Sequence, residues 1–318
     1  MSALITAREL RKEFGDFVAV DGIDFDVAPG ESFGFLGPNG AGKTSTMRMI
    51  GCVSPITSGT MSVFGLDPAT DGPAIRARMG VVPQADQLDS ELTVVENLVI
   101  YGRYFDIPRA ECKRRAAELL DFVQLTDRAD QRVDPLSGGM KRRLTIARSL
   151  MSEPDLLLLD EPTTGLDPQA RHILWDRLYR LKQRGVTLVL TTHYMDEAEQ
   201  LCDRLVVMDD GRIVAEGSPR GLIEQHATRE VLELRLHREA LGESASATAD
   251  EDAAALDAID GIGDRQEVLP DRVLIYAYDG EAALAEVHRR GIEPVGSLVR
   301  RSSLEDVFLR LTGRTLID

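Results

Sequence analysis

The feature that most constrains this chain is a glycine-rich run that ends in lysine and threonine. The run matches the eight-position pattern G-x-x-x-x-G-K-[ST] and consists of Gly37, Pro38, Asn39, Gly40, Ala41, Gly42, Lys43 and Thr44. A short apolar segment at 31–36 precedes it, and helical sequence follows from about Lys43. Glycines let neighbouring backbone N–H groups turn toward one point, and the positive end of the following helix faces the same point. The run therefore predicts a strand, a phosphate-binding loop and a helix.

In such a loop the lysine contacts the β- and γ-phosphates of a nucleotide and the hydroxyl binds Mg²⁺, so we expect these roles for Lys43 and Thr44. ATP and Mg²⁺ are the expected ligands, and Ser45 joins the predicted nucleotide-binding residues. A chance glycine turn is the alternative, but the agreement of the whole pattern and its flanks leaves it little weight. The sequence has no Asn-Lys-x-Asp element, which a GTPase reading would require.

A second stretch ends in two adjacent carboxylates. Leu156–Leu159 is a continuous apolar run, typical of a strand buried on both faces of a parallel sheet, and Asp160 and Glu161 follow it. The carboxyl ends of such strands face the ligand crevice. We expect Asp160 to organise Mg²⁺ and Glu161 to act as general base on the attacking water. A solvated acidic turn before Pro162 is the alternative for Asp-Glu alone.

Between these two elements lies Leu136-Ser137-Gly138-Gly139, followed by Met-Lys-Arg-Arg-Leu. This run resembles the signature sequence of ABC ATPases. The resemblance implies that Ser137, Gly138 and Gly139 cap the γ-phosphate bound by the P-loop of a second subunit, through donors at a helix N-terminus. Met140 stands where the family usually has Gln, and this departure leaves the three phosphate donors unchanged.

The same resemblance assigns four further residues. Gln84 matches the Q-loop glutamine that senses Mg²⁺ and the membrane partner, and Asp167 matches the D-loop aspartate that signals across a dimer. His193 matches the switch histidine at the γ-phosphate, although a lone histidine is more often structural. Phe14 stands where the family places an aromatic that stacks on adenine, and a core phenylalanine is its alternative. The predicted catalytic pair is Glu161 and His193, and the predicted metal ligands are Thr44, Gln84 and Asp160.

Composition limits the remaining possibilities. The formal net charge of −16 argues against unspecific nucleic-acid binding, which needs clustered Lys and Arg. Three widely spaced cysteines make a disulfide framework or a zinc site improbable. The longest apolar runs are far shorter than the ~20 residues of a spanning helix, so another chain must cross the membrane if the protein acts there.

The expected fold is α/β: a P-loop ABC ATPase domain with a mixed-sheet core, an antiparallel subdomain and a helical subdomain, followed by a small α+β accessory domain. Residues 4–27 read as antiparallel strands, 93–152 as helical, and 205–215 as a hairpin. We expect the ATPase domain at 1–227, its helical part at about 88–155, and the accessory domain at 228–318. In the tail we expect strands at 231–236 and 273–278, a polar loop at 240–258 and helices at 281–290 and 303–312.

Three segments resemble the ATPases of ABC-2 type exporters, the group that includes nodulation-factor export and daunorubicin-type drug export: the signature run, 191–199 and 304–313. The resemblance implies a homodimer at the cytoplasmic face of the membrane, held by a separate ABC-2 permease and exporting a drug, lipid or glycolipid. A soluble non-transport ABC ATPase and an importer ATPase are the alternatives. Leu304, Val307, Phe308 and Leu311 form an apolar ladder that fits packing in its own domain or a dimer contact equally well.

Overall fold

The computed structural model of the protein describes residues 3–235, 259–269 and 272–313. The chain divides into two compact units, residues 1–219 and residues 220–315. The predicted polar loop at 240–258 lies outside the described residues.

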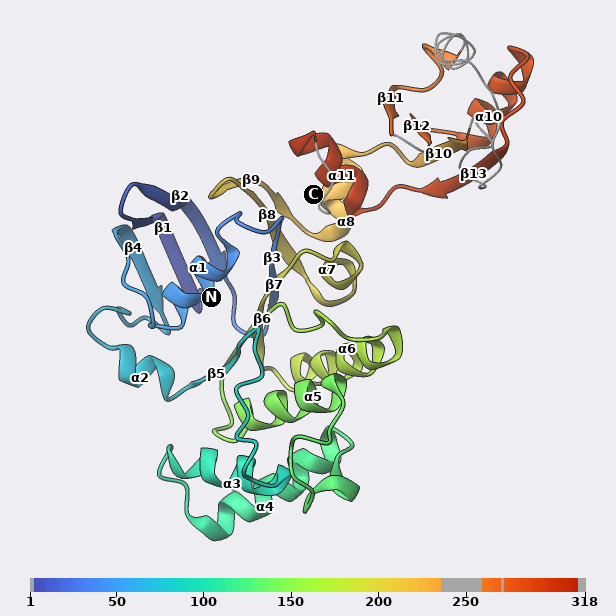
Figure 1. The fold of residues 1–318 in the computed structure, drawn as a ribbon. Helices are drawn as coiled ribbons and strands as arrows, with labels where there is room; N and C mark the ends of the chain where they lie inside the picture. Colours follow the sequence, from blue (N-terminus) through green and yellow to red (C-terminus); the bar gives the residue numbers. More distant parts are fainter. Residues whose placement is uncertain (1–2, 236–258, 270–271, 314–318) are drawn as a thin grey trace. The chain divides into compact units, whose positions relative to one another are not determined.

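The first unit is built around a six-stranded sheet (Figure 1). Its parallel strands are hydrophobic and buried, as expected for a sheet covered on both faces, and only the last strand is antiparallel to its neighbour. In spatial order the strands are β5 (Met79–Val82), β6 (Leu156–Asp160), β7 (Thr187–Thr192), β3 (Ser32–Leu36), β8 (Arg204–Asp209) and β9 (Arg212–Gly217).

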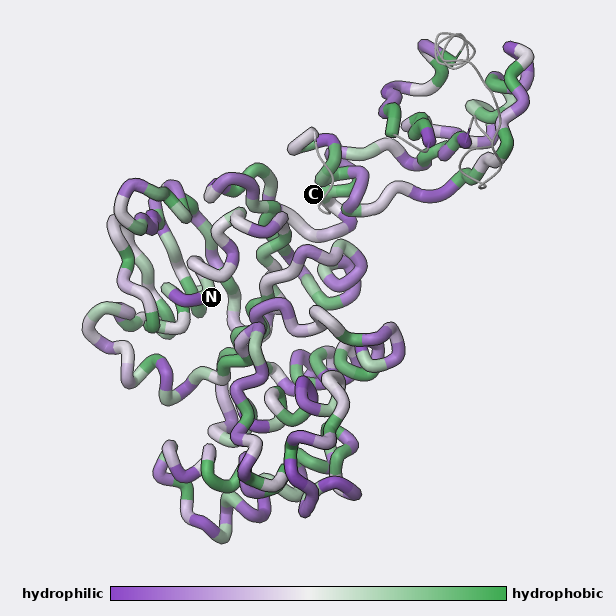
Figure 2. The backbone as a smooth tube through the Cα atoms, in the orientation of Figure 1, coloured by the Kyte–Doolittle hydropathy of each residue, from purple (hydrophilic) through white to green (hydrophobic). Residues whose placement is uncertain are grey.

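A second, three-stranded antiparallel sheet packs beside this core. It consists of β2 (Phe17–Val27), β1 (Ile5–Phe14) and β4 (Ser58–Val63) in that order. Phe25 of β2 lies edge-on to Phe35 of β3, with ring centroids 5.1 Å apart, and Phe33 joins the same cluster. These rings join the two sheets through one hydrophobic core, which fixes the strand that leads into the glycine-rich loop. Figure 2 shows hydrophobic stretches along these strands and hydrophilic stretches along many of the connections.

Helices complete the first unit. Helix α1 (Lys43–Ile50) follows β3, α6 (Pro168–Gln183) and α7 (Met195–Leu201) flank β7, and α2 (Gly72–Arg76) precedes β5. A separate helical part contains α3 (Val94–Arg103), α4 (Arg109–Phe122), the short 3₁₀ helix η1 (Thr126–Arg128) and α5 (Gly138–Ser149). This part has its own core, in which Leu98, Leu120 and Leu144 are buried.

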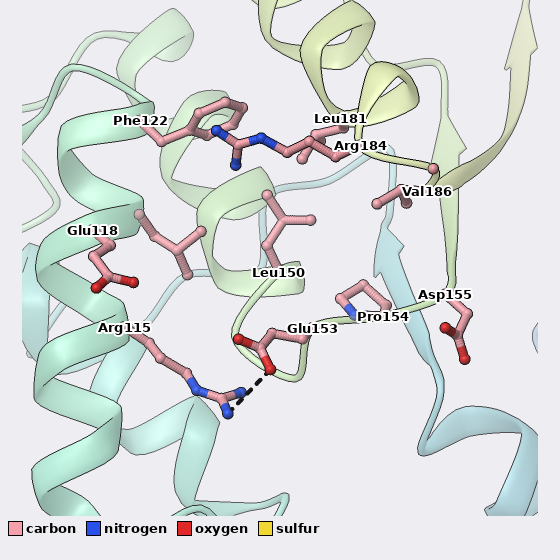
Figure 3. A pocket seen from close by; sticks show the side chains of 12 residues that line it. Arg115, Glu118, Phe122, Leu150, Glu153, Pro154, Asp155, Leu181, Arg184 and Val186 are labelled. Atoms are coloured by element: carbon pink, nitrogen blue, oxygen red, sulfur yellow. Dashed lines mark ion pairs between the residues drawn. The ribbon is translucent and has the colours of Figure 1, made fainter. Parts of the chain in front are cut away.

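Two side-chain contacts attach α4 to the sheet core, around a cavity of about 370 Å³ (Figure 3). Arg115 forms an ion pair with Glu153 at 3.2 Å, on the loop before β6. The guanidinium of Arg184, after α6, lies over the ring of Phe122 at 5.4 Å. Because α5 packs on α4, these contacts also restrain the position of α5, which begins at the signature run.

The second unit holds a four-stranded antiparallel sheet with a helix against it. Strands β11 (Arg265–Val268), β12 (Val273–Ala277), β10 (Glu230–Arg235) and β13 (Gly296–Arg301) lie in that order. Ala283 and Val287 of α10 (Gly280–Arg289) belong to a hydrophobic cluster with one set of strand residues. Leu309 of α11 (Leu304–Thr312) belongs to a second cluster, with Val231, Leu274 and Tyr276, which alternate along the strands with the first set. Helix α8 (Pro219–His226) opens the unit.

The predicted fold class is confirmed. The mixed sheet, the antiparallel sheet, the helical part and the α+β tail are all present. Strands β11 and β13 were not predicted, because as sheet edges they are polar and part-exposed and carry no apolar run. Leu304, Val307 and Phe308 are fully buried within the single chain, which favours packing over a dimer contact.

Helix α3 offers a test of local stability. Thr93 caps it by accepting a hydrogen bond from the backbone of Glu96, whose side chain accepts in return from the backbone of Thr93. We expect Thr93→Ala to lower the free energy of unfolding by about 1 kcal/mol, measured by urea denaturation with circular dichroism. Thr93→Ser keeps the capping oxygen and is the control. Equal losses in both variants would contradict the capping account.

Candidate nucleotide-binding site

The candidate site lies where four adjacent parallel strands end. Strands β5, β6, β7 and β3 are neighbours in the sheet, and their carboxyl ends deliver the predicted residues to one edge. Gln84 follows β5, Asp160 and Glu161 end β6, His193 follows β7, and the glycine-rich loop follows β3. The backbone N–H of Gly37 donates to the carbonyl of Thr192 at 3.3 Å, which fixes the loop against β7.

The glycine-rich loop needs glycine at defined positions. Gly42 has φ +96° directly before α1, and a Cβ there would collide with the carbonyl oxygen of Ala19. Within the loop, the ammonium of Lys43 donates to the carbonyl oxygens of Gly37 at 2.6 Å and Pro38 at 2.9 Å. The Lys43 side chain is buried, and burial lowers its pKa against the opposing attraction of Glu161 and Asp160. The loop thus holds a desolvated cation against its own backbone carbonyl oxygens.

Asp160 sits between two hydroxyls. Its carboxylate oxygen Oδ1 accepts from Thr44 Oγ1 at 3.2 Å and from Thr191 Oγ1 at 2.6 Å. Thr44 lies in the first turn of α1 and Thr191 in the last part of β7, so one carboxylate links three elements. A carboxylate beside a threonine hydroxyl is the hard oxygen set that Mg²⁺ prefers, and these residues therefore fit the metal.

Glu161 is the most constrained residue of the site. Its backbone has φ +45°, in the left-handed region that costs energy for a non-glycine residue. The N–H of Glu161 donates to the carbonyl and hydroxyl oxygens of Thr191, which hold this conformation. Strain of this kind aims a side chain in a direction that the regular strand would not allow.

The carboxylate of Glu161 lies close to three other predicted site residues, Gln84, Lys43 and His193. Oε2 accepts from Gln84 Nε2 at 3.0 Å and from Thr164 Oγ1 at 3.3 Å. Oε1 lies 3.9 Å from Lys43 Nζ and 3.4 Å from His193 Nδ1, the latter without hydrogen-bond geometry. Glu161 is 7% exposed. The geometry offers a nearly buried carboxylate with a donor on one side and a histidine on the other.

Arg142 of α5 was not predicted as a site residue, yet it joins the segments around Glu161. Its guanidinium donates to the carbonyl oxygens of Pro162 at 2.8 Å, Asp160 at 2.9 Å and Glu161 at 3.1 Å. It also donates to the carbonyls of Pro83 and Gln84 at the end of β5. Arg142 is 4% exposed, and burial lowers its pKa although Asp86 opposes that effect.

A cavity of about 210 Å³ adjoins the loop. It is lined by loop residues and by Phe17, Ala19, Gln84 and Glu161. Phe14, the predicted adenine-stacking residue, is not among the lining residues, whereas the exposed Phe17 is. Lys12 lies over the Phe14 ring at 4.7 Å from its centroid. Phe17 was missed because it follows a Gly-Asp turn and carries no motif.

The signature run and Asp167 lie apart from this cavity, since none of them lines it. Ser137 caps α5 by accepting from the N–H of Met140 at 3.3 Å, and Ser137 and Gly138 are exposed. Asp167 caps α6 by accepting from the N–H of Ala170 at 2.8 Å, and it is also exposed. The single chain therefore brings together Thr44, Gln84, Asp160, Glu161 and His193 with the loop, and leaves the predicted capping group facing solvent.

Family models match both parts of the chain. The ABC transporter model matches residues 20–164, and the model for the C-terminal domain of the nodulation factor export protein NodI matches residues 247–313. The "Nod factor export ATP-binding protein I" of Cupriavidus metallidurans is 45% identical over 318 residues, covering 100% of both chains. The chain belongs to the ABC transporter ATP-binding proteins of the NodI type. The protein of the same name from Paraburkholderia xenovorans is 46% identical over 316 residues, covering 99% of each chain.

Solved structures agree with this membership. An ATP-binding cassette of an ABC transporter in its ADP conformation is 26% identical, covers 71% of this chain and 95% of its own, and has a TM-score of 0.64. A dimeric ATP-binding cassette in a post-hydrolysis state with ADP and Pi is 26% identical, covers 67% of this chain and 98% of its own, and has a TM-score of 0.62. This NodI-type subunit is thus an ABC ATPase that binds ATP and couples its hydrolysis to export.

Among residues 3–235, 259–269 and 272–313, every helix of this ABC ATPase is too short or too polar to span a bilayer.

Replacing Arg142 tests whether it holds the site of this ABC ATPase together. Arg142→Leu leaves its carbonyl partners buried without a donor, so we expect a loss of about 3–5 kcal/mol in the free energy of unfolding and a lower kcat. Arg143→Leu is the matched control, because Arg143 donates to Val123 at the end of α4. Stability by urea denaturation and turnover by phosphate release are the measurements. Equal kcat values in the two variants would contradict the assignment.

Proposed function

We propose that this ABC ATPase energises export of Nod factor, or of a closely related amphipathic compound, through a separate ABC-2 type permease. The observation that carries the proposal is full-length similarity to Nod factor export ATP-binding proteins, including a match to the NodI C-terminal domain. A drug as cargo, and with it multidrug resistance, is supported only by resemblance of sequence motifs. The relatives' names therefore favour the lipid-like cargo over a drug.

Within this function Glu161 acts as general base on the attacking water, and His193 contacts the γ-phosphate. The short contacts of Glu161 with Gln84 and His193 support these roles, because a base must be held within reach of the proton it takes. Lys43 and backbone N–H groups of the glycine-rich loop bind the phosphates. Thr44, Asp160 and Gln84 would hold Mg²⁺, which supplies charge neutralisation on the phosphates when bound.

Phe14 or Phe17 stacks on the adenine. Phe14 is supported by its family position, and Phe17 by its place in the cavity lining. Both rings are more than half exposed, at 52% and 61%, so either is available to a flat base. They flank the tight turn between β1 and β2, which places two aromatic rings at one end of the antiparallel sheet.

The active unit is a homodimer with two nucleotides. Ser137, Gly138 and Gly139 open a twelve-residue helix with exposed donors, and a helix N-terminus attracts phosphate oxygens. Since these donors do not line the cavity of their own chain, a second chain supplies them. Asp167, exposed on the neighbouring helix cap, belongs to the same dimer surface. The dimeric cassette among the solved relatives supports this arrangement.

We propose the domain boundaries 1–227 for the ATPase, with a helical part at about 88–155, and 228–318 for an accessory domain. The separation into compact units at residues 219 and 220 supports a boundary in this region.

The ATPase lies at the cytoplasmic face of the membrane, held by the permease. An importer shares the same catalytic residues, and the NodI C-terminal match favours export over import.

Transport into inside-out vesicles tests this proposal. Vesicles that contain this chain and its permease should accumulate labelled Nod factor only when ATP and Mg²⁺ are supplied. Glu161→Gln should abolish accumulation while ATP binding persists, because the amide cannot accept the water proton.

Glu224→Gln is the matched control, since Glu224 lies outside the site on α8, pairs with Arg220 of the same helix and has a side chain 63% exposed. It should transport like the wild type. Absence of ATP-dependent accumulation in the wild type would contradict the cargo, and wild-type turnover in Glu161→Gln would contradict the general base.

A further inference from the structure

A buried carboxyl lies just outside the ATPase site and has no role in the proposal above. Glu197, in the first turn of α7, is 0% exposed. One carboxylate oxygen, Oε1, accepts from the indole N–H of Trp175 at 3.4 Å. The other oxygen, Oε2, and the buried hydroxyl of Thr163 make no hydrogen bond of good geometry in the described part of the chain, although the Thr163 and Thr192 hydroxyls lie close enough to act on the carboxyl. Buried polar groups that lack partners are costly, so they point to a role beyond packing.

The carboxyl of Glu197 faces three segments that carry proposed site residues. The side chains of Thr192, Thr163 and Trp175 all approach it. Thr192 directly precedes His193, and Thr163 follows Glu161 by two positions. Trp175 belongs to α6, the helix that Asp167 caps. Glu197 therefore lies between three segments of the chain: the one that carries His193, the one that carries Thr163, and helix α6.

No cation of the described residues forms an ion pair with Glu197, although the buried Arg142 attracts its carboxylate at longer range. Burial raises the pKa of Glu197 to about 7, the nearby Thr192, Thr163 and Trp175 groups partly oppose this effect, and Asp196 reinforces it. The facing charged or titratable groups are Arg142 on α5, Asp196 on α7, and Cys202 after α7, whose pKa burial raises. Arg142 is occupied by backbone carbonyls, and Asp196 pairs with Arg171 on α6 at 3.1 Å.

We propose that Glu197 is a positioning residue that holds the His193 segment against Thr163 and α6, and that its carboxyl carries a proton when it does so. The inference rests on the proposed roles of Glu161 and His193. A protonated carboxyl is neutral and can donate to a neighbouring oxygen such as the Thr163 hydroxyl. Loss of that proton to solvent leaves a buried anion without a cation of its own and loosens the contact.

The sign of the pH dependence follows from the raised pKa. An unfolded Glu releases its proton at a lower pH than the folded one, so the stabilisation is complete below the unfolded pKa. It is lost as the pH rises through about 7, the folded pKa. Activity that depends on this contact should fall over the same rise in pH.

Trp175 provides a direct probe, because it is the only tryptophan of the chain. We expect the fluorescence of the full-length protein to titrate with a midpoint near pH 7, and this transition to disappear in Glu197→Gln. His172 is itself titratable, and its ring centroid lies 5.1 Å from that of Trp175. The titration is therefore also recorded in a His172→Gln background, where the Glu197 transition should remain.

The pH profile of ATP hydrolysis separates positioning from a passive structural role. Because Gln is neutral at every pH, the ratio of kcat in Glu197→Gln to kcat in the wild type should rise several-fold between about pH 6 and about pH 8.5. KM for ATP should stay unchanged, because the P-loop is not touched. Glu197→Ala, which keeps neither hydrogen-bonding oxygen, should lower kcat across the whole range, with circular dichroism checking that it folds.

A tryptophan transition that survives Glu197→Gln in the His172→Gln background would overturn the inference. Superimposable kcat profiles of wild type and Glu197→Gln would overturn it as well. The fluorescence titration needs no turnover, so a chain that shows the transition but hydrolyses no ATP contradicts the proposed function and leaves the proton site of Glu197 standing.

Discussion

A buried guanidinium connects the separate motifs of this ABC ATPase. Arg142 leaves the helix that begins at the signature run and reaches the backbone carbonyls after β5 and β6. Five donors in a rigid fork suit such a cluster of carbonyls, and lysine could not replace them. The segment that carries Gln84 and the segment that carries Glu161 are therefore held by the same side chain. Displacement of α5, and so of the signature run, would therefore move the backbone of Glu161, the proposed general base.

The local parts of the site could be predicted from the sequence because local chemistry determines them. The glycines of 37–42 and the apolar run before Asp160 identify a loop and a buried strand without any long-range information. Arg142 could not be found in this way, because its carbonyl partners lie 18 to 59 positions away in the chain. Thr191 was missed for a related reason, since only the pairing of β6 with β7 brings it to Asp160, whereas Phe17 was missed because it carries no motif. The edge strands β11 and β13 lack the apolar pattern that marks a buried strand.

The arrangement is what the proposed homodimer requires of one chain. The P-loop, Asp160, Glu161 and His193 converge at the carboxyl ends of neighbouring strands, whereas the donors of Ser137 and Gly138 are exposed on another element. In the proposed homodimer, a phosphate bound by the loop keeps one side open until a second chain closes it. In its proposed positioning role, Glu197 lies behind this site, where a proton rather than an ion pair satisfies a carboxyl between three segments of the chain.

Complementation between two inactive variants tests this two-chain site most directly. Lys43→Ala removes the P-loop cation, and Gly138→Asp places an anion at the signature run, where a Cβ meets nothing within 4 Å in its own chain. Each variant alone should hydrolyse no ATP. An equal mixture forms mixed dimers in which one of the two sites combines an intact P-loop with an intact signature run, so about a quarter of wild-type activity should return. A mixture as inactive as its components, or a fully active Gly138→Asp chain, would contradict the account.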